Sequence, residues 1–239
     1  MDYIWVAILC LVASFVQGTT GFGFSMITMS VFSAFLPYKT AQMLGILTCG
    51  PMFIYIALRN IKKVNFKLII LPTIFAIASI ITVVTLIKSF DDHILKKALG
   101  VVLIILSIYF IFFSKRIKLK KNIPTQIIVG TLSGSLGGLC NMGGPPMVLY
   151  LLNVTDDAVE YNSTLQFFFI FTFSVNLISH LVNGNYTSDV LPYLPYSLSG
   201  MAIGTLVGSA LSKKLNFDFL RKIVYVLIGA IGVFLIVVS

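Results

Sequence analysis

Two polar, glycine-rich stretches about 120 positions apart interrupt an otherwise apolar sequence and carry residue types that could bind a small ion. The first is Gln17-Gly18-Thr19-Thr20-Gly21-Phe22-Gly23-Phe24-Ser25, and the second runs from Ser133 to Pro146. Each lies near the beginning of one half of the chain. Paired interruptions of this kind, rich in glycine or proline, indicate the binding site of a transporter built from two repeats.

The second stretch is the richer in residues that interrupt a helix. Proline fits the first turn of a helix, where its missing N–H group is not needed. The stretch therefore predicts a helix, a glycine turn and the start of a second helix. Such a start carries free N–H groups and a partial positive charge, which favour an anion. The residues concerned are Gly130, Gly134, Gly137, Gly138, Gly143, Gly144, Pro145 and Pro146.

We expect the substrate to bind near the membrane midplane between the interruptions at 17–25 and 137–146, at backbone N–H groups and nearby polar side chains. Close helix packing is the alternative interpretation of such glycines, and it is the preferred one for Gly200-x-x-x-Gly204-x-x-x-Gly208. Asn162, Gln166 and Asn176 are weaker candidates, because buried amides usually bond to neighbouring helices. The candidate substrate-binding residues are Gln17, Thr19, Thr20, Gly21, Gly23, Ser25, Gly138, Asn141, Gly143 and Gly144.

Composition predicts an integral membrane protein of the all-α class. Hydrophobic residues make up 58% of the 239 residues and charged residues 10%, whereas soluble domains have about 25% charged residues. The net charge of +9 does not indicate nucleic-acid binding. The basic residues instead gather at the ends of apolar runs, where they set the orientation of a membrane protein.

Nothing in the sequence predicts catalysis, a cofactor or a metal. Cys10, Cys49 and Cys140 lie inside apolar segments, and no Cys and His spacing typical of a metal site occurs. The sequence contains no array of nucleophile and base, no HExxH and no phosphate-binding loop. We therefore expect no catalytic residue, no metal and no cofactor.

Ten apolar segments follow one another along the chain, five in each half. A helix needs about 20 apolar residues to cross the bilayer, and the first, second and seventh segments are shorter. We expect these three to be half-helices or helices broken partway. The segments are 3–16, 22–36, 41–58, 67–88, 94–113, 123–139, 145–153, 161–182, 190–211 and 219–238.

Three basic clusters set the predicted orientation, because loops rich in Lys and Arg stay in the cytoplasm. With the clusters inside, loop 183–189 and both termini lie outside. Residues 1–114 and 123–239 then form two inverted repeats joined by a basic cytoplasmic linker, 115–122. The clusters are Arg59, Lys62, Lys63 and Lys67; Lys115, Arg116, Lys118, Lys120 and Lys121; and Lys213, Lys214, Arg221 and Lys222.

All eight acidic residues lie at predicted segment ends or in loops. Pumps and cation carriers often hold a carboxylate within the membrane. The apolar segments of this sequence contain no carboxylate, which disfavours a proton relay of buried acids and disfavours a cation as substrate. The acids are Asp2, Asp91, Asp92, Asp156, Asp157, Glu160, Asp189 and Asp218.

The chain resembles the sulfite exporter TauE/SafE family, also called the TSUP family of membrane transporters, over nearly its whole length. The best match is Gly137-Gly138-Leu139-Cys140-Asn141-Met142-Gly143-Gly144-Pro145-Pro146, which is similar to that family's glycine-rich signature followed by proline. The first stretch departs from the pattern, because Thr19-Thr20 stands where a denser glycine run is common. The resemblance implies a transporter of small anions, often sulfite or sulfonates, in a prokaryotic inner membrane.

Residues and resemblance together predict an anion transporter that works by alternating access, with a small anion and the lipid bilayer as its partners. An anion-selective channel would use the same residues but show flux without saturation. A non-transporting scaffold or membrane chaperone would bind no small anion, and a membrane enzyme has the least support. The identity of the anion, the direction of transport, the coupling ion and the formation of a homodimer stay open at this point.

Overall fold

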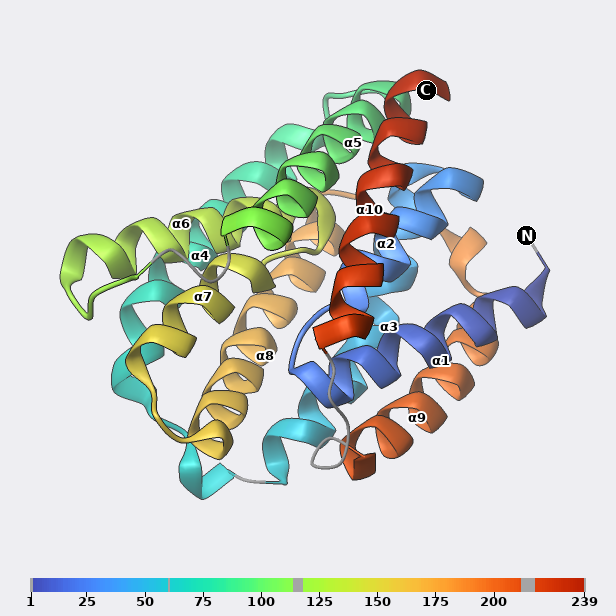
Figure 1. Ribbon diagram of the computed structural model, residues 1–239. Helices are drawn as coiled ribbons and strands as arrows, with labels where there is room; N and C mark the ends of the chain where they lie inside the picture. The colour runs from blue at the N-terminus through green and yellow to red at the C-terminus, as the bar shows by residue number, and fades with distance from the viewer. Residues whose placement is uncertain (1, 60, 114–117, 212–217, 239) are drawn as a thin grey trace. The chain divides into compact units, whose positions relative to one another are not determined.

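The computed structural model describes residues 2–59, 61–113, 118–211 and 218–238, without the side chains of 113 and 218–224. Each of the ten predicted apolar segments contains a helix, and no strand occurs in these ranges (Figure 1). The predicted all-α class is therefore confirmed. The α-helices are α1 Tyr3–Thr20, α2 Phe24–Phe35, α3 Tyr38–Leu58, α4 Phe66–Ile87, α5 Asp92–Ile108, α6 Ile123–Cys140, α7 Gly144–Val154, α8 Ala158–Val182, α9 Leu194–Leu211 and α10 Asp218–Val238.

Three short elements complete the described chain. They are two 3₁₀ turns, η1 Ile61–Lys63 and η3 Ser188–Val190, and a π-helical turn, η2 Tyr109–Phe113, which continues α5. Four basic residues of the predicted linker and the third cluster, Lys115, Arg116, Lys213 and Lys214, lie outside the described residues.

Seven helices of the described chain are long and apolar enough to cross a membrane, which supports an integral membrane protein. One of them is α1, which is longer than the segment predicted over 3–16. The helix continues to Thr20, and the hydroxyls of Thr19 and Thr20 both bond to the Val16 carbonyl inside its last turn. By contrast, α2 and α7 have 12 and 11 residues and are short as predicted.

The described helices gather into two compact units that interleave along the chain. Unit 1 comprises Met1–Thr48, Ser89–Ile117 and Tyr186–Ser239, and unit 2 comprises Cys49–Lys88 and Lys118–Asn185. Each unit thus takes elements from both sequence halves, and the boundary within the first half falls inside α3. The proposed repeats, 1–114 and 123–239, concern internal symmetry and stay a prediction.

The first three helices of each half begin at matching positions. Helices α1 and α6 begin at Tyr3 and Ile123, α2 and α7 at Phe24 and Gly144, and α3 and α8 at Tyr38 and Ala158, so each pair is separated by 120 residues. The ends of α1 and α6, Thr20 and Cys140, keep the same separation. Matching bounds over three consecutive helices are consistent with an internal duplication.

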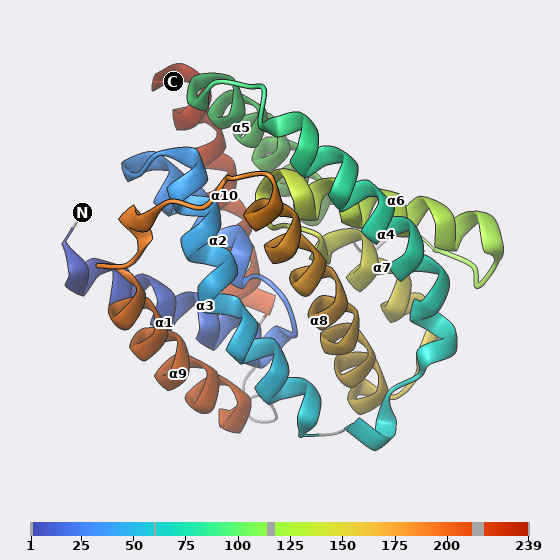
Figure 2. The same cartoon turned by 180° about the vertical axis from the view of Figure 1, so that it is seen from behind.

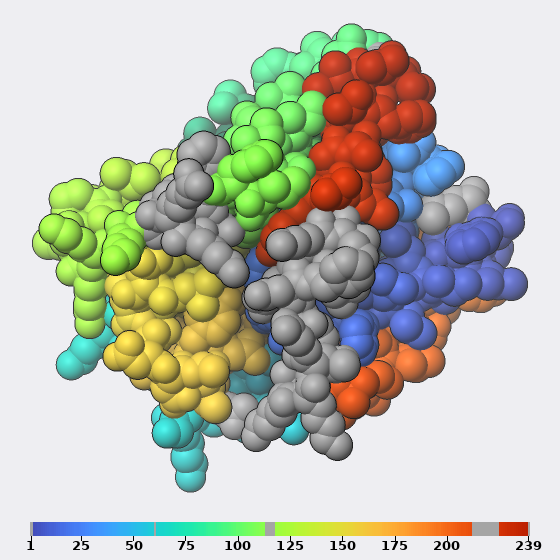
Figure 3. All heavy atoms as spheres, viewed as in Figure 1, coloured from blue at the N-terminus to red at the C-terminus, as the bar shows by residue number. Residues whose placement is uncertain are grey.

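In unit 1, α1 and α9 pack side by side in parallel, as the blue and orange helices and surfaces show (Figures 1, 2 and 3). A Cβ atom added to Gly200, Gly204 or Gly208 would lie 2.0, 2.1 or 2.5 Å from the carbonyl oxygen of Ala7, Leu11 or Phe15, respectively. These glycines therefore let two helix backbones touch. The packing interpretation of the three glycines is confirmed.

In unit 2, α6 packs on α4 in the same parallel manner. A Cβ added to Gly130 or Gly134 would lie 2.3 Å from the carbonyl oxygen of Pro72 or Ala76, and one on Gly138 would lie 3.2 Å from that of Ile80. Four-residue spacing on both helices keeps the contact in register. In unit 1, Gly200, Gly204 and Gly208 lie on α9, which packs against α1. In unit 2, Gly130, Gly134 and Gly138 lie on α6, the helix that ends at the second glycine-rich stretch.

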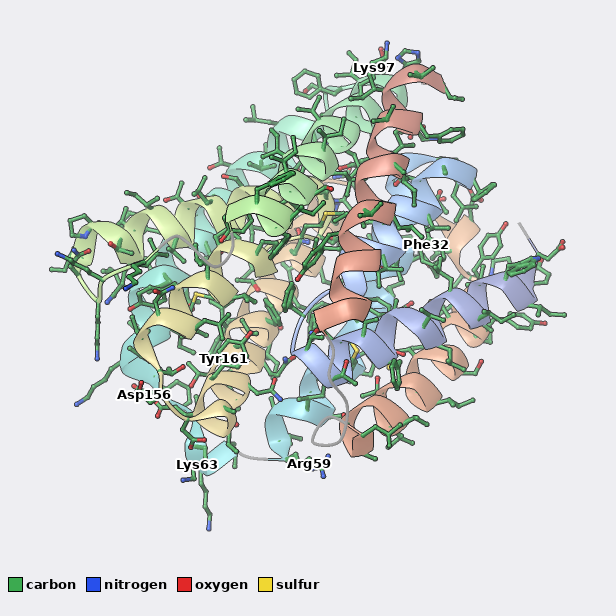
Figure 4. All side chains as sticks on the ribbon, in the orientation of Figure 1. Phe32, Arg59, Lys63, Lys97, Asp156 and Tyr161 are labelled. Carbon is green, nitrogen blue, oxygen red and sulfur yellow. The ribbon has the colours of Figure 1, made fainter. Side chains whose placement is uncertain are left out.

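Most of the exposed basic residues of unit 2 gather at one end, whereas Lys88 follows the other end of α4. Because α4 and α6 are parallel, residues 61–65 and 118–122, which precede them, lie at the same end, and Figure 4 shows Arg59 and Lys63 extending away from the helices. The start of α8 is also at this end, since the N–H of Asn65 donates to Thr164 Oγ1 at 3.0 Å. The 25-residue α8 then carries the chain to the other end. Asn183, which follows α8, therefore lies at the other end of unit 2 from residues 61–65, and the placement of the two loops on opposite sides of a membrane stays a prediction.

We predict that Gly204→Ala lowers the unfolding temperature of the purified protein in detergent. The added methyl group meets the Leu11 carbonyl and the Ser14 hydroxyl, and overpacking of this kind costs about 1–3 kcal/mol. Ala202→Val adds methyl groups at an exposed position of the same helix and serves as the control. Equal unfolding temperatures for wild type and Gly204→Ala would contradict the backbone contact.

Candidate functional site: two interrupted helix pairs

Break 1, residues 21–23, separates α1 from α2 by only three residues in unit 1. Gly21 has φ 84° and its N–H donates to the Gln17 carbonyl at 2.8 Å, which ends α1 with a left-handed residue. Gly23 has φ 115° and immediately precedes α2. Both glycines therefore occupy conformations that other residues rarely adopt, and the chain reverses into the new helix over a minimal distance.

The side chain of Gln17 connects the two sides of break 1. Its Nε2 donates to the Gly21 carbonyl at 2.9 Å, and its Oε1 accepts from the N–H of Phe24, the first residue of α2, at 3.1 Å. Gln17 is 2% exposed. An apolar environment offers no other partner for these backbone groups. The amide thus stabilises the break, and its bonding atoms face the protein's own backbone.

The three hydroxyl candidates of break 1 differ in their surroundings. Thr20 is buried, and its hydroxyl donates within the break to the Phe22 carbonyl at 2.6 Å or to the Val16 carbonyl. Thr19 is half-buried and its hydroxyl bonds to the Val16 carbonyl at 2.8 Å. Ser25 is half-buried in the first turn of α2.

The first turn of α2 retains two free backbone donors. Gln17 accepts the N–H of Phe24, and the N–H of Ile27 bonds to the Gly23 carbonyl at 3.1 Å. No acceptor for the N–H groups of Ser25 and Met26 is found among the residues that the structure describes. These two groups lie at the positive end of the helix dipole, where a negative charge is favoured.

An aromatic stack anchors the middle of break 1. The ring of Phe22 lies 5.6 Å from that of Phe110 in the π-helical turn, and Phe110 stacks on Tyr225 of α10 with centroids 4.6 Å apart. Phe22 is 8% exposed. The apolar residue between two glycines therefore fixes the break against α5 and α10, a role that the sequence analysis did not assign.

Break 2, residues 141–143, separates α6 from α7 in unit 2. Asn141 has φ 60°, its N–H bonds to the Gly137 carbonyl at 2.9 Å, and the N–H of Met142 bonds to the Leu136 carbonyl at 3.1 Å. The expected glycine turn is therefore wrong in its position. The glycines up to Gly138 are helical, and the turn is made by Asn141, one of the few residue types that tolerate the left-handed region.

Asn176 of α8 holds break 2 from outside. Its Nδ2 donates to Asn141 Oδ1 at 2.9 Å and to the Gly137 carbonyl at 3.2 Å. Position 137 is a glycine, so this break has no internal amide equivalent to Gln17. A neighbouring helix supplies the amide instead. The sequence analysis included Asn176 only as a weaker candidate, because its role depends on tertiary contact.

The start of α7 fits closely against α6 and has few donors. A Cβ on Gly143 would lie 2.6 Å from the Ser133 carbonyl oxygen, so only glycine allows this approach. Pro145 and Pro146 follow Gly144 in the first turn and carry no N–H. Within the described chain, the N–H groups of Gly143 and Gly144 have no acceptor.

Nine of the ten predicted binding residues lie at one of the two breaks. Gly138 does not, because it faces α4, where its Cβ would lie 3.2 Å from the Ile80 carbonyl oxygen and from Val83 Cβ. Asn141, Gly143 and Gly144 are brought together at break 2. The residues brought together at break 1 are Gln17, Thr19, Thr20, Gly21, Gly23 and Ser25.

A family model described as sulfite exporter TauE/SafE matches residues 6–235, almost the whole chain. The chain belongs to the sulfite exporter TauE/SafE family. The match includes both breaks and both units, so the family assignment applies to the complete helical arrangement. Membership in this family supports a role in membrane transport of sulfur-containing anions. Neither the curated proteins nor the solved structures gave a match.

We predict that Gln17→Leu destabilises this TauE/SafE protein by about 2–4 kcal/mol. The variant keeps the buried volume but removes the acceptor of the Phe24 N–H, at about 1–3 kcal/mol, and the hydrogen bond to the Gly21 carbonyl, at about 1 kcal/mol. Thermal unfolding in detergent measures the effect.

Thr19→Val is the control for Gln17→Leu. The Thr19 hydroxyl bonds only to the Val16 carbonyl, which also accepts a bond from Thr20 at 2.9 Å. Its removal leaves no group unpaired, and we expect a loss below about 1 kcal/mol. Similar losses in the two variants would contradict the assigned role of Gln17.

Proposed function

We propose that this protein carries a small sulfur-containing anion, of the sulfite or organosulfonate class, across a prokaryotic inner membrane by alternating access. The family match supports the substrate class. The interrupted helices support a carrier, because broken helices near the midplane are the typical binding elements of such transporters.

The observation that carries the proposal is the first turn of α2. The N–H groups of Ser25 and Met26 have no acceptor in the described part of the chain, and they lie at the positive end of a 12-residue helix. Ser25 is half-buried beside the break and adds a hydroxyl donor, whereas the hydroxyl of the half-buried Thr19 donates to the Val16 carbonyl. Neutral donors of this kind bind an anion without a fixed positive charge, so that the anion can also be released.

Break 2 differs from break 1 at the start of its second helix. The N–H groups of Gly143 and Gly144 remain, whereas Pro145 and Pro146 supply none. The donors of break 1 lie within the first turn of α2 and include the hydroxyl of Ser25, and we therefore assign the anion contacts to break 1. The amides of Gln17 and Asn141 act mainly by holding each break in shape, since their oxygen atoms accept bonds from Phe24 and Asn176, respectively.

The proposal is tested by ligand binding and by transport. Purified protein is heated with sulfite, sulfate, thiosulfate, methanesulfonate or acetate, and we expect a sulfur oxyanion to raise the unfolding temperature. Uptake of the stabilising anion into proteoliposomes should saturate with concentration. Flux without saturation would indicate a channel, and no response to any anion would contradict the proposal.

Ser25→Pro tests the backbone donor itself. Proline is tolerated in the first turn of a helix but lacks the N–H group, and Pro145 occupies the equivalent position of α7, 120 residues later. Loss of a hydrogen bond to a charged group costs about 1.5–3 kcal/mol, so we expect the Kd to rise about 10- to 100-fold. Ser25→Ala keeps the N–H and should have a smaller effect. Equal Kd values in both variants would exclude this donor.

We also propose that both termini lie outside the cytoplasm. Single cysteines are introduced by Lys62→Cys and Ser188→Cys after the buried Cys10, Cys49 and Cys140 are replaced by alanine. An impermeant thiol reagent should label Ser188→Cys in intact cells and Lys62→Cys only after permeabilisation, because basic loops stay in the cytoplasm. The reverse pattern would invert the orientation.

A further inference from the structure

Two buried oxygen atoms near break 2 have no hydrogen-bond partner in the described part of the protein. They are Oδ1 of Asn176 and Oγ of Ser133. Asn176 is 5% exposed and Ser133 1%. Buried polar groups of native proteins are nearly always hydrogen-bonded, and an exception requires an explanation.

The free atom of Asn176 can only accept. Both hydrogens of its Nδ2 have acceptors, Asn141 Oδ1 at 2.9 Å and the Gly137 carbonyl at 3.2 Å. These two bonds fix the amide so that Oδ1 is the atom left over, with its lone pairs unused. A group that satisfies Asn176 Oδ1 must therefore be a hydrogen-bond donor or a cation.

Ser133 lies next to the same place. It precedes Gly137 by one helical turn, on the same face of α6, and its carbonyl oxygen lies 2.6 Å from the Cβ position of Gly143. A serine within a helix often donates to the carbonyl four residues earlier, and this one does not. Ser133, Gly137, Gly143 and Asn176 thus meet where α6 ends and α7 begins.

The chemistry of this cluster differs from that of an anion site. Its unused side-chain atoms are neutral oxygens, and they lie near the C-terminal end of α6, which carries partial negative charge. Lone pairs and a negative helix end repel an anion. Mg²⁺ and Ca²⁺ are usually bound with carboxylates, whereas the free side-chain atoms at this point come from an amide and a hydroxyl.

We infer that break 2 binds a monovalent cation, Na⁺, through Asn176 Oδ1 and Ser133 Oγ. Broken-helix transporters coordinate Na⁺ with unwound carbonyls and the C-terminal ends of half-helices, and α6 ends at this break. The assignment of Na⁺ as a coupling ion rests on the proposed transport function, but the binding itself does not.

The inference is tested by thermal unfolding of the purified full-length protein in NaCl, KCl or choline chloride at equal ionic strength, without a sulfur anion. We expect NaCl alone to raise the unfolding temperature, with saturation. Ser133→Ala should raise the half-saturating Na⁺ concentration about tenfold, the change expected for about 1.4 kcal/mol of lost binding. Because the Ser133 hydroxyl has no partner among the described residues, this variant should fold like wild type.

Ser33→Ala is the matched control. Ser33 is also a buried helical serine, in α2, and its hydroxyl has no partner in the ranges that the structure describes. Its removal should leave the Na⁺ response unchanged. Equal unfolding temperatures in NaCl and choline chloride, as a bound water would give, overturn the inference. So does an equal effect of KCl, or an equal effect of the two serine variants.

The outcomes separate this inference from the proposed function. Stabilisation by sulfite in choline chloride, without any response to Na⁺, removes the cation site and keeps the anion carrier. A saturable Na⁺ response that Ser133→Ala weakens, without a response to any sulfur anion, supports the cation site and removes the anion carrier.

Discussion

The need to pair backbone groups inside the membrane governs the form of this protein. Hydrocarbon offers no hydrogen bonds, so each group freed by an interrupted helix costs several kcal/mol unless the protein pairs it. Both breaks are accordingly reduced to three residues, and an amide side chain holds each one. Gln17 does so from within break 1, and Asn176 does so from α8 at break 2. A longer unwound segment would need more such partners.

Close contact between helix backbones is the second requirement. Most of the glycines that allow it lie on different helices of the pair in the two units. Backbone contact needs small residues on only one of two helices. In unit 1 three such residues lie on α9, and Gly18 of α1 adds a close contact, since its Cβ would lie 3.2 Å from the Thr205 carbonyl oxygen. In unit 2 the glycines lie on α6 itself, and Gly137 stands at the position equivalent to Gln17.

The sequence predicts the helices and the locations of both breaks well, because apolar runs and paired Gly and Pro residues depend on local physics. It predicts the role of individual glycines less well. Gly134 and Gly138 look like parts of a turn, but both serve packing against α4, and Asn141 makes the turn. Contacts between distant segments are the least predictable. Asn176 is 35 residues from Asn141, and no local pattern links the two.

The two breaks have matching positions in the chain but differ in backbone and in chemistry. Gly23 has φ 115°, whereas Gly143 has φ −67°. Ser25 and Pro145 stand at equivalent positions, so the first turn of α2 has an N–H donor where the first turn of α7 has none. Break 2 instead retains unused acceptor oxygens at Ser133 and Asn176. A helix dipole supplies only about half a charge at each end. An anion held by neutral donors therefore keeps most of its negative charge inside the membrane, where charges are poorly solvated. A cation bound to the same protein would make the loaded carrier less charged overall. The division of donors and acceptors between the two breaks is a physical means to that end.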